Sequence, residues 1–493
     1  NAQFNSIDMA GVNSYKDGVV SKLHKGLQGL VKSRSVTYIE GHGRLVGKNE
    51  IEVNGERHQG KNIILATGSY PKTLPGLEID GKQIITSEQA LNMDRVPKSV
   101  IVLGGGVIGC EFASVWKSFG SEVTIIEALP HLIALEDESS SKQLERAFRK
   151  RGINFELGTR FKSAERNDKG VVVTLEDGKQ FNAEVLLVAV GRGPVSANIG
   201  YEEQGIAMDR GYILVDEKCR TNIPGIWAVG DLIPTLQLAH VGFAEGILVA
   251  EEIAGLNPRP INYDGVPRVT YSDPEVASVG LSTAAAKERG HDVVELNYDL
   301  AGNGKANILK TSGSVKLVAA KNGPILGIHM VGARVGELLA EAQLIFNWEA
   351  EATDVASLIH AHPTMSEAVG EADAEQRDAR HRRRRLGEGG DGHGLVVEVA
   401  AACGVGGELA VGVEAHQLHA GSKPVLCRLE FLLRDALTLC VEVGRRDFTG
   451  QFVSVTVPDA LFKATLDVVI DDFGQTAKFP FNGLRFLNED IEY

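Results

Sequence analysis

Cysteine is scarce in this chain, and its few cysteines stand far apart. In 493 residues they are Cys110, Cys219, Cys403, Cys427 and Cys440. They form no CxxC pair and have no four-ligand spacing, so we expect neither a zinc site nor a disulfide framework.

Long hydrophobic runs are also missing. The sequence contains no run of about 18 apolar residues, which is the length that a membrane-spanning helix needs. The first residues, NAQFNSIDMA, lack the charged start and apolar core of a secretion signal. We therefore expect a cytoplasmic protein that does not insert into a membrane. The chain opens without Met near a helix-forming stretch, SYKDGVVSKLHKGLQGLVKS, so we also expect that further chain precedes residue 1.

Positive charge is in deficit. The chain has 51 Lys and Arg against 65 Asp and Glu, which gives a net charge of -14. A negative surface repels phosphates, which argues against nucleic acids and acidic membrane surfaces as general partners. Because 43% of the residues are hydrophobic, the chain can build roughly two to four domain cores. This composition fits an enzyme that acts on small molecules.

The order of expected elements is that of an α/β protein. Short apolar runs ending in Gly, Asn or Ser make residues 35–69 strand-like. Residues 98–127 combine an apolar strand, a glycine-rich turn, a helical stretch and a second strand, which is a β-α-β unit. We expect further helices at 139–152, 238–255 and 336–352, with strands between them.

The glycine-rich turn has the spacing of a dinucleotide site. Gly104, Gly106 and Gly109 form GxGxxG between a strand and a helix, and Glu127 ends the next strand. The first glycine makes the tight turn, the second lets the backbone approach a pyrophosphate, and the third lets helix and strand pack closely. A carboxylate at the position of Glu127 binds a ribose 2'-hydroxyl and repels a 2'-phosphate, which favours NAD over NADP. The alternative is a glycine-rich turn beside a surface acid.

Two further turns suggest a second nucleotide. Residues 66–69 (ATGS) end an apolar strand with small side chains, and Asp231 ends the strand GIWAVGD. A carboxylate at the carboxyl edge of a strand can bind polyol hydroxyls. Each turn alone is equally typical of an ordinary strand end.

Seven motifs in order resemble those of the FAD-dependent pyridine nucleotide-disulfide oxidoreductases. They are GGGVIGCEFASVW, LLVAVGRGP, TNIPGIWAVGD, LAHVGFAEG, YSDPEVASVG, ILGIHMVG and HAHPTMSEA. The resemblance covers about residues 1–372. It implies doubly wound, Rossmann-like FAD and NAD domains with an α+β interface domain. The implied boundaries are 1–79 with 205–248 for FAD, 80–204 for NAD and 249–372 for an incomplete interface domain.

The resemblance also implies the site residues. For NAD these are Gly104, Gly105, Gly106, Val107, Ile108, Gly109, Cys110, Glu111, Glu127, Phe161 and Gly191. For FAD they are Gly43, Thr67, Gly68, Ser69, Asp231, Gln237, Leu238, Ala239 and His240. His362 would be the acid/base and Glu367 its orienting carboxylate. The motifs are most similar to those of homodimeric members that oxidise dihydrolipoamide on the carrier domain of a 2-oxo acid dehydrogenase complex.

The motif HAHPTMSEA also supports an acid/base site on its own residues. Proline favours the first helical turn, so we expect His362 just outside a helix that begins at Pro363. Glu367 could then hold one imidazole nitrogen and leave the other for a substrate thiol. In the alternative, His362 caps a helix and His360 is a core or surface histidine. A third ligand is missing, so we expect no metal.

Departures from the family pattern bear on activity. The family's first β-α-β unit, with a CxxxxC redox disulfide, would precede residue 1, and no two of the five cysteines stand five apart. We therefore expect this chain to bind NAD, to bind FAD weakly or not at all, and not to reduce a disulfide. Alternatives are a sibling mercuric or glutathione reductase, a soluble transhydrogenase, or an inactive chain that binds NAD.

The family likeness stops near residue 372. Residues 377–385 hold six arginines and precede a glycine-rich run, which is typical of a solvated linker. Residues 373–493 stay unassigned. Their later part could fold as a small α/β piece, or the reading frame changes near codon 372 and the tail never evolved to pack.

Overall fold

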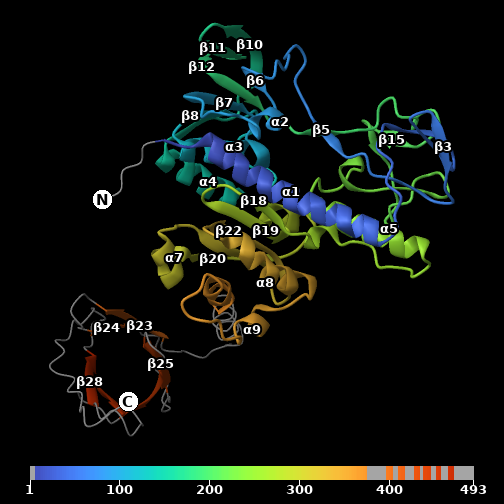
Figure 1. Cartoon of the computed structure of the whole chain (residues 1–493). Coiled ribbons are helices and arrows are strands. Elements are labelled where there is room, and N and C mark those ends of the chain that lie inside the picture. Colours follow the sequence, from blue (N-terminus) through green and yellow to red (C-terminus); the bar gives the residue numbers. More distant parts are fainter. Residues whose placement is uncertain are drawn as a thin grey trace. The chain divides into compact units, whose positions relative to one another are not determined.

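The computed structural model describes residues 6–374 and, beyond them, the backbone of six strands. The chain divides into two compact units, Asn1–Arg382 and Arg383–Tyr493. The first unit has two five-stranded sheets with helices packed on them (Figure 1). The expected α/β class is confirmed there.

A parallel sheet, in the order β6-β13-β7-β8-β9, forms the core of the expected NAD domain. Its strands are β6 (Ile84–Ile85), β7 (Ser99–Leu103), β8 (Glu122–Ile126), β9 (Ile153–Glu156) and β13 (Val185–Val188). The helices beside it are α2 (Ser87–Ala90), α3 (Val107–Phe119) and α4 (Glu138–Arg151). Every residue of β13 is buried, which explains its continuous apolar sequence.

Glycines in the left-handed region end both long helices of this part. Gly120 follows α3 with φ 105°, and Gly152 follows α4 with φ 73°. This conformation favours glycine, so the chain turns back into β8 and β9. An antiparallel sheet of β10 (Phe161–Asn167), β11 (Gly170–Leu175) and β12 (Gln180–Ala183) follows β9.

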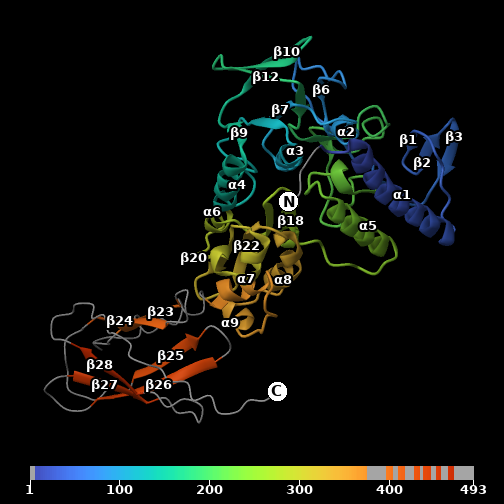
Figure 2. The ribbon, with the colours of Figure 1, turned by 60° about the vertical axis from the view of Figure 1, so that its left-hand side comes forward.

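The segments that flank this part in sequence form smaller sheets. They are β1 (Gly43–Gly47), β2 (Glu50–Val53) and β3 (Glu56–Gln59); β4 (Ile63–Leu65) with β17 (Ile226–Ala228); β5 (Ser69–Pro71) with β14 (Arg192–Pro194); and β15 (Met208–Asp209) with β16 (Tyr212–Ile213). The helices are α1 (Met9–Ser33), η1 (Gly230–Leu232) and α5 (Ala239–Ile253). Every residue of α1 is exposed or half-buried, and α1 lies beside α5 in both ribbon views (Figures 1 and 2).

An antiparallel sheet in the order β18-β19-β22-β21-β20 forms the core of the expected interface domain. Its strands are β18 (Arg268–Thr270), β19 (Glu275–Gly280), β20 (Val293–Asp299), β21 (Ser314–Ala320) and β22 (Ile325–Gly332). Its helices are η2 (Tyr263–Gly265), α6 (Thr283–Glu288), η3 (Leu300–Gly302), α7 (Gly304–Leu309), α8 (Val335–Asn347) and α9 (Ala352–Val355). Leu317, Ile328 and Leu339 share its apolar core.

The described part of the second unit consists of strands. They are β23 (Val396–Cys403) with β24 (Leu409–His416), and the sheet β25 (Cys427–Leu433), β26 (Leu437–Arg445), β27 (Gln451–Thr456) and β28 (Thr465–Ile470). The arginine run lies outside the described residues. The small α/β piece and the frame change both stay predictions.

Local sequence signals placed most elements of the first unit correctly. The β-α-β unit and the helices near 139–152, 238–255 and 336–352 are confirmed. The first strand of the strand-like stretch 35–69 begins only at Gly43, and β1 to β5 lie within or just beyond that stretch. Among the helices of the described residues, none is long and apolar enough to cross a membrane. The predicted domain boundaries stay predictions.

Candidate cofactor and acid-base sites

In the glycine loop between β7 and α3, two glycines are tightly packed and a third borders free space. A Cβ on Gly104 would lie 2.3 Å from the carbonyl oxygen of Ala189, and a Cβ on Gly109 would lie 1.9 Å from that of Gly104. Among the described residues, no atom lies within 4 Å of a Cβ on Gly106. The first and third glycines therefore pack the loop, while the second faces free space that a pyrophosphate could approach.

Helix α3 points its N-terminus into this space. Its N-cap is Gly106, whose side-chain hydrogen cannot cap the first amides, so these N–H groups are available to an anion. Val107 is 40% exposed, Ile108 is half-buried and Cys110 is fully buried. These observations fit a dinucleotide phosphate at the start of α3.

Two residues at the start of α3 serve the protein's own packing. The thiol of Cys110 donates to the carbonyl oxygen of Gly105 at 3.3 Å, and burial raises its pKa far above the usual range, so it is a poor nucleophile. The carboxylate of Glu111 accepts from the backbone N–H of Tyr271 at 2.8 Å, and burial raises its pKa. For both residues a direct role with NAD stays a prediction.

Glu127 lies beside the loop, as expected from its place after β8. One carboxylate oxygen accepts from the backbone N–H of Gly105 at 2.6 Å and the other from that of Leu129 at 2.7 Å. Each oxygen has a second lone pair, so the carboxylate can still accept from a ribose hydroxyl. The two amide contacts orient it.

The remaining NAD candidates differ in their contacts. Gly191 has φ 103° and stands two residues after Ala189, whose carbonyl meets Gly104, so the structure brings it near the loop. Phe161 is half-buried and packs against the apolar cluster of Val171, Val173 and Leu175. Its role beside the adenine stays a prediction.

The first group of FAD candidates forms a polar cluster. The hydroxyl of Ser69 donates to the carboxylate of Asp231, although 162 residues separate them. Arg192 donates to the hydroxyl of Ser69 at 2.7 Å and to its carbonyl oxygen at 2.8 Å. Gly68 has φ 73°, and no described atom lies within 4 Å of a Cβ there. The end of β4 thus leaves room for a ligand beside an oriented carboxylate.

The second group lies near the start of α5. The side-chain amide of Gln237 donates to the carbonyl oxygen of Asp231 at 3.5 Å, and Leu238 is the N-cap before Ala239. His240 contacts the carbonyl oxygen of Pro267 at 2.9 Å through Nε2. These residues fit one side of a dinucleotide. Gly43 is an exposed residue of β1 that pairs with Val53, and its place near FAD stays a prediction.

Sequence reasoning missed Glu245, which fixes the Gly230–Asp231 turn. This carboxylate is fully buried in α5 and accepts from the Gly230 N–H at 2.6 Å, the Thr235 hydroxyl at 2.8 Å and the Tyr263 hydroxyl at 2.9 Å. A buried acid needs such partners. The signal available in the sequence was a single acid inside the otherwise apolar run HVGFAEGILVA.

His362 and Glu367 form the expected pair. Nδ1 of His362 lies 2.8 Å from Oε1 of Glu367, whose Oε2 accepts from the Thr364 N–H at 2.7 Å. The side chain of His362 is 74% exposed, which leaves Nε2 free to meet a substrate. Such an arrangement suits proton transfer.

The expected helix start at Pro363 is wrong. The helical residues begin at 367, and the His362–Pro363 peptide is cis. The hydroxyl of Thr364 donates to the carbonyl oxygen of Ala361 at 2.6 Å, so residues 361–366 form a turn closed by side chains. Glu367 therefore orients His362 from the first helical residue.

A buried acidic group lies behind this pair. His360 is largely buried and contacts Glu341 of α8 at 2.7 Å through Nε2, which supports the core role for this histidine. Asp373 is fully buried, and neither of its carboxylate oxygens has a partner among the described residues. Burial raises the pKa of Asp373 to about 8, with repulsion from Glu341 as the second cause.

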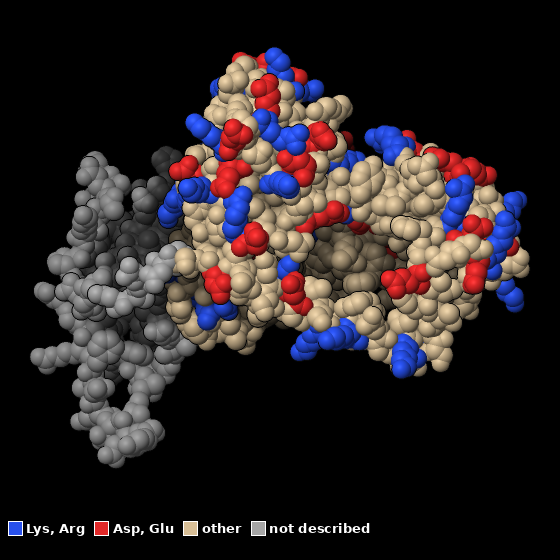
Figure 3. All heavy atoms as spheres, turned by 45° about the horizontal axis from the view of Figure 1, so that its top comes forward, with Lys and Arg blue, Asp and Glu red and all other residues tan. Residues whose placement is uncertain are grey.

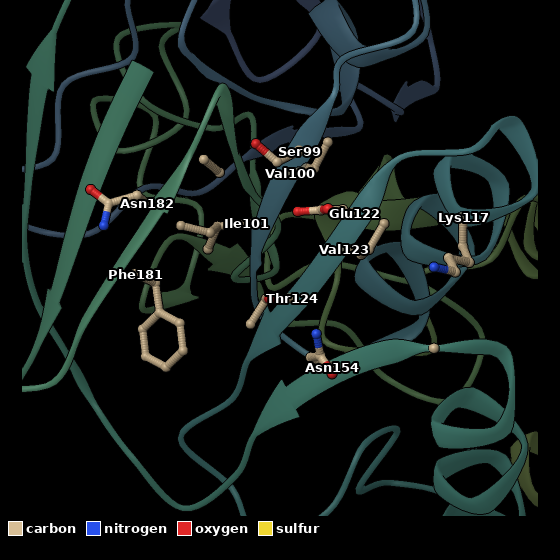
Figure 4. A pocket seen from close by; sticks show the side chains of 12 residues that line it. Ser99, Val100, Ile101, Lys117, Glu122, Val123, Thr124, Asn154, Phe181 and Asn182 are labelled. Atoms are coloured by element: carbon tan, nitrogen blue, oxygen red, sulfur yellow. The ribbon is translucent and has the colours of Figure 1, made fainter. Parts of the chain in front are cut away.

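The surface of the first unit has a hollow and a pocket. The face of the first unit seen in Figure 3 is deeply hollowed, with mainly uncharged walls and acidic groups at its rim. Figure 4 shows a pocket of about 380 Å³, lined by Ser99, Glu122 and Lys117 among others. Ser99 and Glu122 begin β7 and β8, so this pocket lies at the strand ends opposite the glycine loop. Dinucleotides bind at the carboxyl ends, so it is not the NAD site.

Family models match most of the first unit. Residues 2–246 match the model described as pyridine nucleotide-disulphide oxidoreductase, and residues 266–373 match the dimerisation domain of the same family. The second match ends one residue after the expected break at 372.

Individual relatives agree with these matches. Dihydrolipoyl dehydrogenase from Cupriavidus necator is 40% identical over 74% of this chain and 79% of its own length. Leghemoglobin reductase from Glycine max is 38% identical over 77% of this chain and 75% of its own length. The structure of LpdA from Mycobacterium tuberculosis matches with a TM-score of 0.71 and 26% identity, over 76% of this chain and 84% of that one.

A flavoprotein disulfide reductase is also similar. RclA from Escherichia coli, described as HOCl-induced, matches with a TM-score of 0.70 and 26% identity, over 75% of this chain and 86% of that one.

Two glycine substitutions should separate packing from ligand approach. Gly106→Ala places its methyl group in free space, so stability should hold while NAD affinity falls about tenfold or more, because the methyl group occupies the phosphate path. Gly109→Ala drives a methyl group into a backbone carbonyl and should destabilise the protein by about 1–3 kcal/mol. Urea unfolding and calorimetric titration with NAD measure the two effects. Equal NAD affinity of wild type and Gly106→Ala would contradict the assignment.

The buried carboxyl group of Asp373 should make the stability of the protein depend on pH. The native state keeps a proton that the unfolded state releases above its ordinary pKa of 3.8, so stability falls as pH rises from there through about 8. Asp373→Asn has no titrating carboxyl group at this position, so it should not show this fall in stability. Its melting temperature should match that of the wild type near pH 4 and exceed it above pH 8, as measured by circular dichroism. Parallel pH profiles of the two proteins would contradict the buried-acid assignment.

Proposed function

This chain belongs to the pyridine nucleotide-disulphide oxidoreductase family, and from that premise we propose that its residues serve the oxidation of dihydrolipoamide by NAD through FAD. The family is enzymatic and uses FAD and NAD. Similarity to dihydrolipoyl dehydrogenases from bacteria and plants supports the substrate. The pairing of His362 with Glu367 is the observation that carries the proposal.

His362 is the proposed acid/base. Its Nδ1 is held 2.8 Å from Glu367, so Nε2 is the nitrogen that would take a proton from a thiol of dihydrolipoamide and later release it to solvent. Glu367 fixes the ring and stabilises its charged form while the proton is held. His360 cannot replace His362, because its Nε2 is engaged with Glu341.

The residues of the two nucleotide sites would bind and orient the cofactors. When bound, FAD and NAD supply electron and hydride transfer. Gly104, Gly106 and Gly109 with the start of α3 would hold the NAD pyrophosphate, and Glu127 its ribose. Residues 67–69 and 237–240 with Asp231 would contact FAD.

No CxxxxC pair for dithiol chemistry occurs within these 493 residues. Cys110 and Cys219 are both buried, and burial with the nearby charge of Glu245 raises the pKa of Cys219 to about 12. Neither is a thiolate near neutral pH. We therefore propose that these residues alone bind NAD and do not turn over dihydrolipoamide.

The proposed partners follow from the same family. The dimerisation-domain match at residues 266–373 supports a homodimer. Trp348 is 75% exposed and Ile359 fully exposed after α8 and α9, as expected of an apolar surface that a second copy covers. A lipoyl carrier domain of a 2-oxo acid dehydrogenase complex would present the substrate, in the cytoplasm.

The absorption spectrum and a turnover assay of the purified chain test the proposal. We expect saturable NAD binding and, because no CxxxxC pair occurs within these 493 residues, no reduction of NAD by dihydrolipoamide. Turnover that is lost in His362→Gln would confirm the role of this histidine and contradict the predicted inactivity. A chain that binds neither NAD nor flavin would contradict the proposed function.

Glu127 should set the choice between NAD and NADP. Glu127→Gln keeps an oxygen for one of the two backbone N–H groups, of Gly105 or Leu129, and removes the charge that repels a 2'-phosphate. The ratio of the two dissociation constants should therefore shift toward NADP by about tenfold. Glu122→Gln, on the exposed first residue of β8, is the matched control. An unchanged ratio in Glu127→Gln would rule out this selectivity role.

A further inference from the structure

A row of polar residues crosses the antiparallel sheet from one edge to the other. Arg268 pairs with Ser278, Ser278 with His329, His329 with Lys316, and Lys316 with Asn297. Residues directly opposite on antiparallel strands share a face, so all five side chains lie on one face of the sheet. Ser278, His329 and Lys316 in the middle of the row are buried.

The start of α4 brings two acids to this row. Glu136 contacts Arg268 at 3.1 Å and accepts from the hydroxyl of Ser278. Asp137, the N-cap of α4, contacts Nζ of Lys316 at 2.9 Å. The side chains of Asp137 and Lys316 are 3% and 9% exposed. Because both side chains are almost fully buried, solvent screens the attraction between their charges only weakly.

Lys316 is the cation of the pair and has two acidic neighbours. Besides Asp137, its Nζ contacts Glu295 of β20 at 2.9 Å, and Glu295 also contacts Lys287 of α6. His329 faces the same region from β22. Burial lowers its pKa, so it is neutral near pH 7 and leaves Lys316 as the charge that meets Asp137.

The segment between Glu127 and Asp137 connects this ion pair to the glycine loop. Its Glu127 end accepts from the Gly105 N–H. In its middle, the Ile133 N–H donates to the Gly105 carbonyl at 2.7 Å, and Leu132 is packed so tightly against Gly105 that a Cβ there would lie 2.7 Å from it. The segment is thus tied to Gly105 at two places and to Lys316 at its far end.

We propose that Lys316 and Asp137 are positioning residues of the dinucleotide site, which hold segment 127–137 so that Gly105 and Glu127 keep their binding geometry. This inference rests on the proposed function, since it takes the glycine loop as the NAD site. Lys316 stands 179 residues from its partner in sequence. It acts through Asp137 and touches no cofactor.

The test is calorimetric NAD titration of the whole chain with substitutions of Lys316. Lys316→Met removes the charge and should weaken NAD binding about tenfold while the number of sites per chain stays the same. Lys316→Arg restores a cation and should recover most of the affinity. The matched control is Lys321→Met, because Lys321 forms an exposed ion pair with Asp292 just after the same strand. It should bind NAD like the wild type.

Other outcomes decide against the inference in distinguishable ways. If Lys316→Met lowers the melting temperature but keeps the wild-type NAD affinity, the pair is structural and the inference is overturned while the proposed function stands. If the wild type does not bind NAD, both fall together. If Lys316→Met does not fold, the double variant Asp137→Asn, Lys316→Met replaces it, because it leaves no unpaired charge between these two positions. The inference then requires that this double variant bind NAD about tenfold more weakly than the wild type.

Discussion

The close approach of Gly109 to the carbonyl of Gly104 is the contact on which the nucleotide side of the molecule depends. A single added carbon would lie 1.9 Å from that oxygen, so only glycine lets α3 begin directly over the end of β7. This approach aims the first amides of α3 at the space beside Gly106. The anion site follows from it, and Glu127 and Ile133 hold the same loop through Gly105.

A second constraint comes from buried charge. Asp137 and Lys316 join the parallel-sheet part of the first unit to its antiparallel sheet, and Glu245 joins the Gly230 turn to α5 and Tyr263. Buried pairs contribute little net stability compared with apolar packing, but a group left without its partner is costly. Such contacts therefore specify one arrangement. The exposed pair Arg210–Asp209, with side chains 87% and 59% exposed, has no comparable effect.

Features with local signals were predictable from the sequence. The β-α-β unit, its three glycines and Glu127 lie within about thirty residues, and His362 and Glu367 are five apart, so spacing alone was informative. Lys316, His329 and Glu245 were not predictable, because their partners are set by strand register and helix packing. The helix start at Pro363 failed because the Thr364 and Glu367 side chains close a turn first.

The central claim is that NAD binds at the start of α3 and that segment 127–137 belongs to its site. Backbone hydrogen exchange with and without saturating NAD tests this most directly, because it reads each segment separately. The account predicts slower exchange with NAD at residues 104–110 and 127–133, with residues 99–101 and 180–183 around the opposite pocket unchanged. Protection confined to that opposite pocket, or none at the glycine loop, would contradict it.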